Sequence, residues 1–521
     1  MNALHFNTAG PNKDYLHYGI APLSRINLPE LLRLIADERY FVLHAPRQTG
    51  KTTCMMALRD HLNASGQYLA VLVNVEPAQA MRENVEAAMA AICYLISSEF
   101  TYLTGAALSN DLSSAPLSVR LTGLLRAIAQ ASELPVVLFL DEVDSLVGDS
   151  LISLLRQIRA GYPDRPQRFP QSVILFGVRD VRDYRMTLPS GEVITGGSAF
   201  NIKAESLRLG DFSRAEMAAL YDQHTAATGQ VFDAQAREVA WESTQGQPWL
   251  VNALAEQAVW KTPANLDRTQ VIDFERMRAA REALILRNDT HLDQLHDKLR
   301  EPRVRHVIEP MLLGENIDQQ EQDRQYVLDL GLVRLGPQKN LIPKNSIYAE
   351  VLPRALSAGV QLNIHSDYIR PDWQDAQGRM LPKTFLRNFQ DWWRQHGEVM
   401  RSSVSYHEAA PHLILMAYLQ RVVNGDGYIS REYAAGSGRL DLMVEHGGVK
   451  MAIEVKVWRD KQADPLIEGL QQIERYLDRL QLESGFLVLF DRRSSAPEWA
   501  ERMSWLETTT ASGKAVSVLR A

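Results

Sequence analysis

Residues 40–63 have the composition of a segment that binds phosphate groups. The apolar run Tyr40–His44 predicts a buried strand, and Gly50 to about Asn63 predicts a helix. Between them Lys51 can reach the terminal phosphates of a nucleotide, and the Thr52 hydroxyl can bind magnesium, while backbone N–H groups wrap the phosphates. A chance Gly-Lys-Thr triplet at a helix start is the alternative. We expect ATP and Mg²⁺ to bind through Ala45 (in place of the usual glycine), Pro46, Arg47, Gln48, Thr49, Gly50, Lys51, Thr52 and Thr53.

Two acids follow the apolar run Val136–Leu140, which predicts a second buried strand. In a nucleotide-hydrolysing site with this order, Asp141 supports the magnesium ion through water. Glu142 orients or deprotonates the attacking water. The alternative is a buried strand that ends in a solvated acidic turn.

An arginine, often from a neighbouring subunit, usually stabilises the transition state of such a reaction. The candidates surround a third predicted strand, Ser172–Val178. They are Arg159, Arg165 and Arg168 before it, and Arg179 and Arg182 after it. Each of them alone is also compatible with a solvated surface arginine.

A separate group of charged residues lies near the end of the chain. Glu454 and Lys456 are two residues apart on a predicted strand, so their side chains point to one face of a sheet. A turn at residues 446–448 can bring Asp441, on the preceding strand, next to Glu454. Two carboxylates can hold Mg²⁺, which activates water, while the lysine offsets negative charge. The alternative is a solvated Glu–Lys pair on an exposed strand.

The distribution of predicted helices and strands along the sequence indicates several domains. Predicted strands alternate with helices in the first 180 residues, which favours an α/β fold with a mostly parallel sheet. We expect a core at 1–210 with an N-terminal extension, a helical lid at 211–290, a winged-helix-like segment at 291–363, a linker at 364–383 and a second α/β domain at 384–521. Phe389, Trp392 and Trp393 are expected to pack inside that last domain rather than to stack on bases.

The N-terminal part resembles the AAA-like/STAND branch of P-loop ATPases over residues 5–355. The resemblance rests on HAPRQTGKT, on Ala9-Gly10-Pro11 with Tyr18, Pro22 and Arg25, and on Gly246 and Pro248. It implies that Gly246 and Pro248 lie near the nucleotide in the lid. It also implies nucleotide-dependent dimers or rings.

The C-terminal part resembles the PD-(D/E)XK nuclease superfamily over residues 384–495, in the RecB-like form with Gln-x-x-x-Tyr at Gln472 and Tyr476. The order helix, three strands, helix, strand fits that fold. The resemblance implies catalytic roles for Asp441, Glu454, Lys456 and Gln472. It also implies Glu408 as a further metal ligand.

Net charge, cysteine content and the lack of long apolar runs indicate in which compartment the protein is expected. The formal net charge is −7, so the whole chain has no basic field of the kind that favours nucleic-acid binding. Cys54 and Cys93 form no zinc or disulfide pattern, which fits a reducing compartment. No secretory segment and no apolar run of the length of a membrane span is expected, so the prediction is cytoplasmic.

The leading hypothesis is an ATP-gated nuclease that cleaves DNA with magnesium. The alternative is a STAND-like switch whose C-terminal domain binds nucleic acid or a protein without cutting it. A weaker third option is an ATPase with a degenerate tail. Convergence of Glu408, Asp441, Glu454 and Lys456 in an open cleft would favour cutting.

Overall fold

The computed structural model describes residues 4–82, 84–106, 108, 115–146, 148–178, 185–187, 193–195, 203–287, 295, 297–313, 321–337, 339–363, 371–403, 414–416, 418–419, 427–433 and 440–521. The chain forms two compact units. The first contains residues 1–287 and 325–331, and the second contains 288–324 and 332–521. Each unit is described separately below, and the predicted domain boundaries remain predictions.

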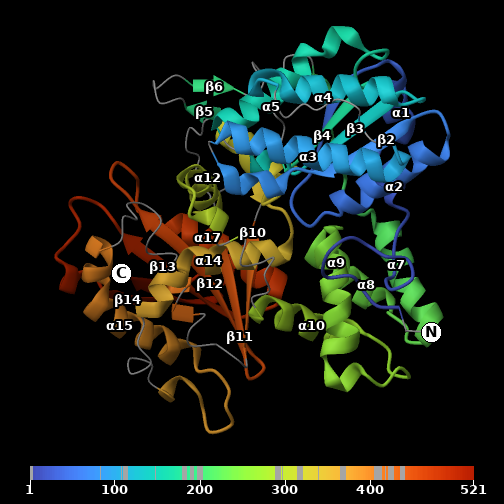
Figure 1. Ribbon diagram of the computed structural model, residues 1–521. Coiled ribbons are helices and arrows are strands. Elements are labelled where there is room, and N and C mark those ends of the chain that lie inside the picture. The colour runs from blue at the N-terminus through green and yellow to red at the C-terminus, as the bar shows by residue number, and fades with distance from the viewer. Residues whose placement is uncertain are drawn as a thin grey trace. The chain divides into compact units, whose positions relative to one another are not determined.

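A parallel sheet lies at the centre of the N-terminal unit (Figure 1). Its strands are β1 (Tyr40–His44), β2 (Leu69–Asn74), β3 (Val136–Asp141), β4 (Ser172–Gly177) and β7 (Lys203–Arg208). Their order across the sheet is β2-β3-β4-β1-β7, and every pairing is parallel. The predicted α/β fold with a parallel sheet is confirmed for this part. The apolar runs of β1, β3 and β4 are buried along their whole length because helices cover both faces.

Two apolar clusters lie on the two faces of this sheet. One face packs against α3 (Val85–Thr104), α4 (Leu117–Ala131) and α5 (Gly148–Ala160), which lie together in Figure 1. The other packs against α1 (Leu28–Ala36) and α2 (Lys51–Ala64). The sheet therefore forms the middle layer of three.

The start of α3 is set by the conformation of the residues before it. A 3-10 turn, Glu76–Met81, precedes α3 and is separate from it. The break occurs because Arg82 has a positive φ of 49° and Asn84 caps α3 by accepting a bond from the Ala87 N–H. Among the described helices α3 is also the one whose length and composition would allow it to cross a membrane. One of its faces packs in the core cluster, as in the core helix of a globular domain.

Helices follow the sheet in the remainder of the N-terminal unit. They are α7 (Arg214–Thr228), α8 (Ala234–Thr244), α9 (Pro248–Glu256), a π-helical turn (Gln257–Lys261) and α10 (Phe274–Leu286). A two-stranded ribbon, β5 (Arg185–Thr187) with β6 (Val193–Thr195), precedes β7. A capping box of Ser213 and Glu216 begins α7.

The first residues of the chain pack against this helical region (Figure 1). The Gln223 side chain on α7 bonds both the N–H and the carbonyl of Gly19, at 3.0 and 2.7 Å. The Tyr18 hydroxyl lies 3.3 Å from Nδ1 of buried His224. The N-terminal segment is thus part of the folded unit.

The middle of the chain, where the sequence predicts a winged-helix-like segment, contains helices and a pair of short strands. The elements are α12 (Pro302–Leu313), α13 (Glu321–Asp329), β8 (Val333–Leu335), β9 (Leu341–Pro343) and α14 (Ser346–Asn363). The strands β8 and β9 form an antiparallel pair. The winged-helix interpretation remains a prediction.

A mixed sheet forms the C-terminal part of the second unit. Its strands are β10 (Gly427–Tyr433), β11 (Leu440–His446), β12 (Val449–Trp458), β13 (Ser484–Asp491), β14 (Ser504–Thr509) and β15 (Ala515–Arg520). The first three form an antiparallel meander, and β13 pairs in parallel with both β12 and β15. The helix α17 (Leu466–Leu480) connects β12 to β13 and packs on the sheet. The order of strands and helix from β10 to β13 agrees with the prediction.

The other face of this sheet packs against α15 (Pro382–Ser403), which contributes the buried aromatic side chains Phe389, Trp392 and Trp393. Their predicted packing role is confirmed. Trp373 and Met380 are buried in the same cluster. Trp373 and Met380 therefore pack against the C-terminal domain, while the linker at 364–383 stays a prediction. Two apolar side chains among many polar ones gave no periodic signal in the sequence.

The glycine at the start of the α9 turn is required by a close backbone contact. Gly246 has a φ of +76°, and a Cβ atom there would overlap the Phe212 carbonyl oxygen. The Phe212 N–H also donates to the Gly246 carbonyl at 2.8 Å. This contact joins the segment that leaves β7 to the start of α9.

We predict that Gly246→Ala destabilises the N-terminal unit by about 2–5 kcal/mol, because it adds a backbone overlap to left-handed strain. Gly229→Ala is the matched control, since Gly229 has a φ of +80° with no atom within 4 Å of a built Cβ. It should cost about 1–2 kcal/mol. The midpoint of the first thermal unfolding transition measures both, and equal losses would contradict the prediction.

Candidate functional site

The phosphate-binding segment joins β1 to the N-terminus of α2, as the sequence predicted. Gln48 and Gly50 have positive φ angles of 59° and 80°, and the Thr49 hydroxyl donates to the Pro46 carbonyl at 2.7 Å. Ala45 is fully buried, and its N–H donates to the Gly177 carbonyl at 3.1 Å. Its φ is not in the left-handed region, so alanine replaces glycine here without strain.

Lys51 lies beside the two predicted acids at the carboxyl end of β3. Its Nζ atom is 3.7 Å from Oε1 of Glu142, and the side chain is 6% exposed. Nζ is buried and donates no hydrogen bond to a described residue. An ammonium group with unused donors can donate hydrogen bonds to the oxygens of a phosphate. Thr52 is exposed in the first turn of α2, where its hydroxyl is accessible.

The Asp141 carboxyl is buried and lies in a field of other charges. Burial raises its pKa to about 6, the Lys51 ammonium lowers the pKa, and the Glu142 carboxylate raises it. The Glu142 N–H donates to Oδ1 of Asp141 at 2.9 Å. Asp144, which the sequence analysis did not single out, also raises this pKa, and its Oδ2 accepts from the Val178 N–H at 3.3 Å. A buried carboxyl of this kind fits a bound divalent cation, which would replace the missing positive charge.

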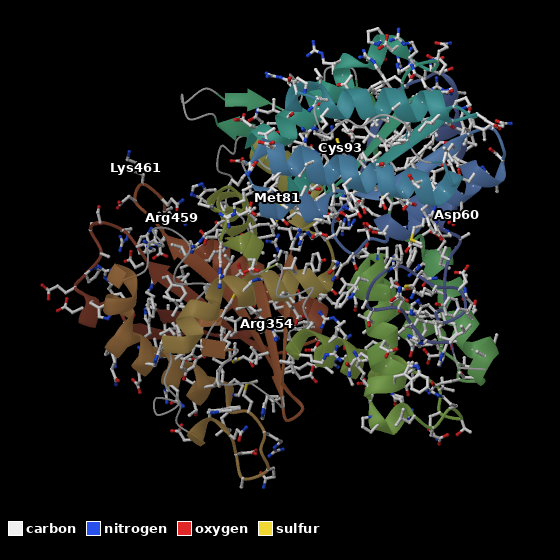
Figure 2. The ribbon with its side chains drawn as sticks, in the orientation of Figure 1. Asp60, Met81, Cys93, Arg354, Arg459 and Lys461 are labelled. Atoms are coloured by element: carbon white, nitrogen blue, oxygen red, sulfur yellow. The ribbon has the colours of Figure 1, made fainter. Side chains whose placement is uncertain are left out.

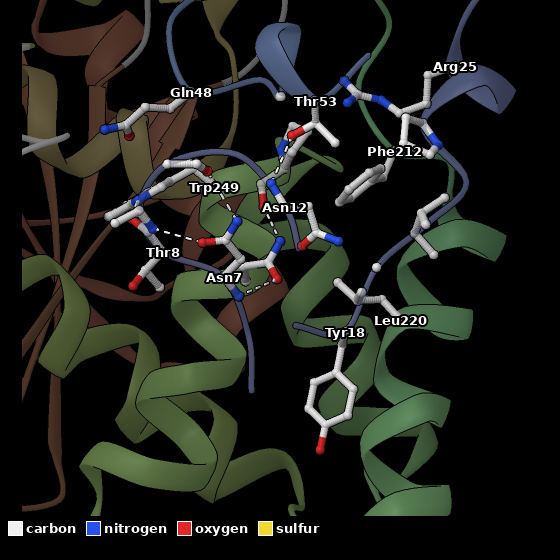
Figure 3. A pocket seen from close by; sticks show the side chains of 18 residues that line it. Asn7, Thr8, Asn12, Tyr18, Arg25, Gln48, Thr53, Phe212, Leu220 and Trp249 are labelled. Atoms are coloured by element: carbon white, nitrogen blue, oxygen red, sulfur yellow. Dashed lines mark hydrogen bonds between the residues drawn. The ribbon is translucent and has the colours of Figure 1, made fainter. Parts of the chain in front are cut away.

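A cavity of about 140 Å³ lies next to the phosphate-binding segment (Figure 3). Three segments far apart in the sequence line it: the N-terminal residues, the loop with Gln48 and Gly50, and the helical region. Hydrogen bonds tie these segments together. The Asn12 N–H donates to the Thr53 hydroxyl at 3.0 Å, and the Trp249 indole donates to the Thr8 carbonyl at 2.9 Å. The volume is smaller than that of a complete ligand pocket, so it suits one part of a nucleotide, such as its base.

The predicted lid residues lie at this cavity. Pro248 lines it, and Gly246 begins the same turn. The Gln247 amide donates to the Gln48 carbonyl at 3.5 Å. The structure therefore brings Gly246 and Pro248 close to the phosphate-binding segment.

The candidate arginines differ in their surroundings. The Arg165 guanidinium stacks 3.4 Å from the Tyr162 ring centre and donates to the Tyr162 carbonyl, so it has a structural role. Arg159 and Arg168 are exposed where β4 begins, at the sheet edge opposite to the carboxyl ends. They therefore lie away from the carboxyl-end edge of the sheet, where Lys51, Asp141 and Glu142 meet. Arg179 and Arg182 lie outside the described residues.

The C-terminal charged residues lie on neighbouring strands. The antiparallel register pairs Asp441 with Glu454, as the turn at 446–448 predicted. The Lys456 Nζ atom is 3.4 Å from Oε1 of Glu454 and 3.3 Å from Oε1 of Glu468. The structure therefore brings the lysine and two carboxylates together. The Asp441 side chain and all of Glu408 lie outside the described residues.

Glu468 was missed by the sequence analysis. It lies four residues before Gln472 on α17, and its Oε1 accepts from the Gln472 amide at 2.5 Å. Glu468, Gln472 and Tyr476 follow one another at a spacing of four, so they share one face of the helix. That spacing is the signal that could have identified Glu468.

The carboxylate of Glu454 is covered by protein. Its side chain is 0% exposed, beneath α17. The described residues contain no group of three His, Cys, Asp or Glu side chains arranged to hold a metal. The basic residues Arg459 and Lys461 follow in the loop after β12 (Figure 2), and Lys461 is exposed.

Comparison with known proteins identifies the type of domain that contains the phosphate-binding segment. Residues 35–184 match the family model of the AAA domain. This range contains the phosphate-binding segment, Asp141 and Glu142. The AAA domain of this chain is thus a P-loop ATPase module. No curated protein matches the chain.

Several solved structures are similar at low identity. The Walker-type ATPase PABY2304 of Pyrococcus abyssi has 14% identity and a TM-score of 0.46, over 67% of this chain and 99% of that one. A single-residue variant of RuvB of Thermotoga maritima has 15% identity and a TM-score of 0.33, over 62% and 92%. Cdc6p of Pyrobaculum aerophilum has 16% identity and a TM-score of 0.34, over 64% and 93%. None of these values is high enough to transfer an activity or a partner to this chain.

The raised pKa of Asp141 predicts a pH-dependent stability. Between about pH 4, the ordinary value, and about pH 6, the folded protein keeps a proton that the unfolded chain has lost. The stability of the free protein therefore falls as pH rises through this window and stays lower above it. Asp141→Asn removes this effect, on the order of 2 kcal/mol.

The variant should unfold at a higher temperature than the wild type at pH 7.5, and the difference should shrink at pH 5. Thermal unfolding without nucleotide or magnesium measures it. Asp149→Asn, at an exposed acid in the first turn of α5, is the control and should follow the wild-type pH profile. A difference for Asp141→Asn that does not change with pH would contradict the assignment.

Proposed function

We propose that the AAA domain binds ATP and hydrolyses it with magnesium. The observation that carries the proposal is the buried Lys51 ammonium, 3.7 Å from Glu142 and next to Asp141 at the end of a parallel strand. Ligands bind outside the carboxyl ends of such strands. The conformation of residues 45–52 supports the same conclusion.

Each residue has a distinct role in this proposal. Lys51 neutralises the β- and γ-phosphates, and Glu142 takes a proton from the attacking water or orients it. Thr52 and Asp141 would hold magnesium, Asp141 through water. The ion supplies charge stabilisation on the phosphate oxygens. The exposed Arg168 or Arg159 would complete the site of a neighbouring subunit in a homo-oligomer.

The roles of Lys51 and Glu142 can be separated experimentally. We predict that Lys51→Ala abolishes ATP binding. Glu142→Gln should keep ATP binding but lower the hydrolysis rate by about 10²–10⁴-fold, because it removes only the base. Calorimetry and a phosphate-release assay measure these effects. Glu133→Gln, at an exposed acid just before β3, is the control and should behave as the wild type. Full hydrolysis by Glu142→Gln would refute its role.

We infer for the C-terminal domain a magnesium-dependent cleavage of DNA, gated by the ATPase. The pairing of Asp441 with Glu454 and the contact of Lys456 with Glu454 support it. Two carboxylates with a lysine suit the activation of water beside a phosphodiester. Gln472 would position the site through Glu468. In this proposal Glu408 is a further metal ligand, and the protein acts in the cytoplasm.

The burial of Glu454 favours an alternative function. A carboxylate that is 0% exposed has no access to a hydrated metal ion in this conformation. In that case the ATPase is a switch, and the C-terminal domain binds nucleic acid or a protein without cutting. Cleavage requires that α17 moves or that the site opens.

A cleavage assay separates the two functions. Plasmid and single-stranded DNA are incubated with the protein and Mg²⁺, with and without ATP. We predict that Lys456→Ala lowers cleavage at least about 100-fold, because it removes the charge that faces the phosphate. Lys450→Ala is the matched control, since Lys450 lies on the same strand but is exposed at its other end.

Stimulation by ATP would establish that the two domains are coupled. Cleavage that both lysine variants retain would point to a contaminant and against the site. If the wild type hydrolyses ATP but cuts neither DNA, the switch is the better description.

A further inference from the structure

An arginine of the N-terminal segment lines the cavity next to the phosphate-binding segment. Arg25 ends the 3-10 turn Pro22–Arg25 and lines the cavity together with Gly50 and Thr53. Its Nη1 atom is 3.0 Å from the position that a Cβ atom on Gly50 would occupy. The guanidinium is therefore in contact with the phosphate-binding segment. Figure 3 shows it on the same side of the cavity as Thr53 and Phe212.

The rest of the Arg25 side chain is held in place by the protein. Its Nε atom donates to the Gly210 carbonyl at 3.0 Å, and Nη2 donates to the same oxygen. Its Cζ atom is 5.0 Å from the centre of the Phe212 ring. These contacts fix the plane of the guanidinium and leave Nη1 directed at Gly50.

The charge of Arg25 is not neutralised by a direct ion pair. Among the described residues, no carboxylate oxygen lies within 4.0 Å of its nitrogens, although other arginines of this unit form such pairs. Arginine stays protonated in proteins. A fixed positive group with a free donor edge, beside a phosphate-binding loop, is suited to an anionic ligand.

We propose that Arg25 binds the nucleotide phosphate nearest the ribose, in the same subunit as Lys51. Lys51 lies toward Asp141 and Glu142 and serves the terminal phosphates, whereas Arg25 lines the cavity next to Gly50 and Thr53, and Lys51 is not among the lining residues. Lys51 and Arg25 thus bind different phosphates of the same nucleotide. This inference rests on the proposed ATP binding.

The same arginine connects the nucleotide to the helical region. Gly210 and Phe212 belong to the segment between β7 and α7, and the Phe212 N–H donates to the Gly246 carbonyl at 2.8 Å. A phosphate bound to Arg25 is thereby linked through the guanidinium to the Gly210 carbonyl. Arg25 is therefore a positioning residue for the lid as well as a ligand contact.

Competition binding tests the proposal. In this experiment adenosine, AMP, ADP and ATP compete with a fluorescent ATP analogue for the wild type, Arg25→Ala and Arg25→Lys. Arg25→Ala should weaken the binding of AMP, ADP and ATP by about 10–100-fold, because a charge-assisted hydrogen bond to the phosphate is lost. The affinity for adenosine should not change. Arg25→Lys should restore part of the AMP affinity. Arg33→Ala, at an arginine that is 61% exposed on α1, is the matched control.

The outcomes distinguish this inference from the ATP proposal. A loss for adenosine equal to that for AMP would mean that Arg25 only supports the fold, and would overturn the inference. Unchanged AMP affinity, with ATP binding that still depends on Lys51, would overturn it alone. If no nucleotide displaces the analogue from the wild type, the ATP proposal fails as well.

Discussion

The AAA domain depends on the burial of one ammonium group beside two carboxyl groups. Lys51 lies 3.7 Å from Glu142, longer than a hydrogen bond, and burial raises the pKa of the neighbouring Asp141 to about 6. Removing charges from water is unfavourable unless they are well paired. Because the pairing is incomplete, Lys51 can still donate to a phosphate, and the Asp141 carboxyl can still interact with a cation. The strand β3 and the loop after β1 have to end at one edge of the sheet for these groups to meet.

The C-terminal domain repeats this arrangement in a different fold. Lys456 lies between Glu454 and Glu468, near the carboxyl end of β12, where β12 and β13 run parallel. Here the lysine has two carboxylate partners within 3.4 Å, and Glu454 is covered by α17. The covered carboxylate and the fully paired lysine distinguish this site from the one at Lys51.

The fold was predictable where the local pattern was strong. The apolar runs that became β1, β3 and β4 stood out because strands buried on both faces are continuous in hydrophobicity. The strand β7, with the sequence KAESLR, has no such run, since it lies at the edge of the sheet. The burial of Trp373 could not be predicted from the sequence either, because it comes from contacts with a distant part of the chain.

The sequence alone determined which residues have chemistry suited to each site. The spacing of Lys51 and Thr52 after a strand, and the turn that aligns Asp441 with Glu454, follow from local backbone geometry. Only the tertiary structure placed Arg25 against Gly50, and Glu468 between Lys456 and Gln472. The first of these contacts joins segments distant in sequence, and both depend on how helices and loops pack on their sheets. That packing is decided by the whole core, which no local pattern encodes.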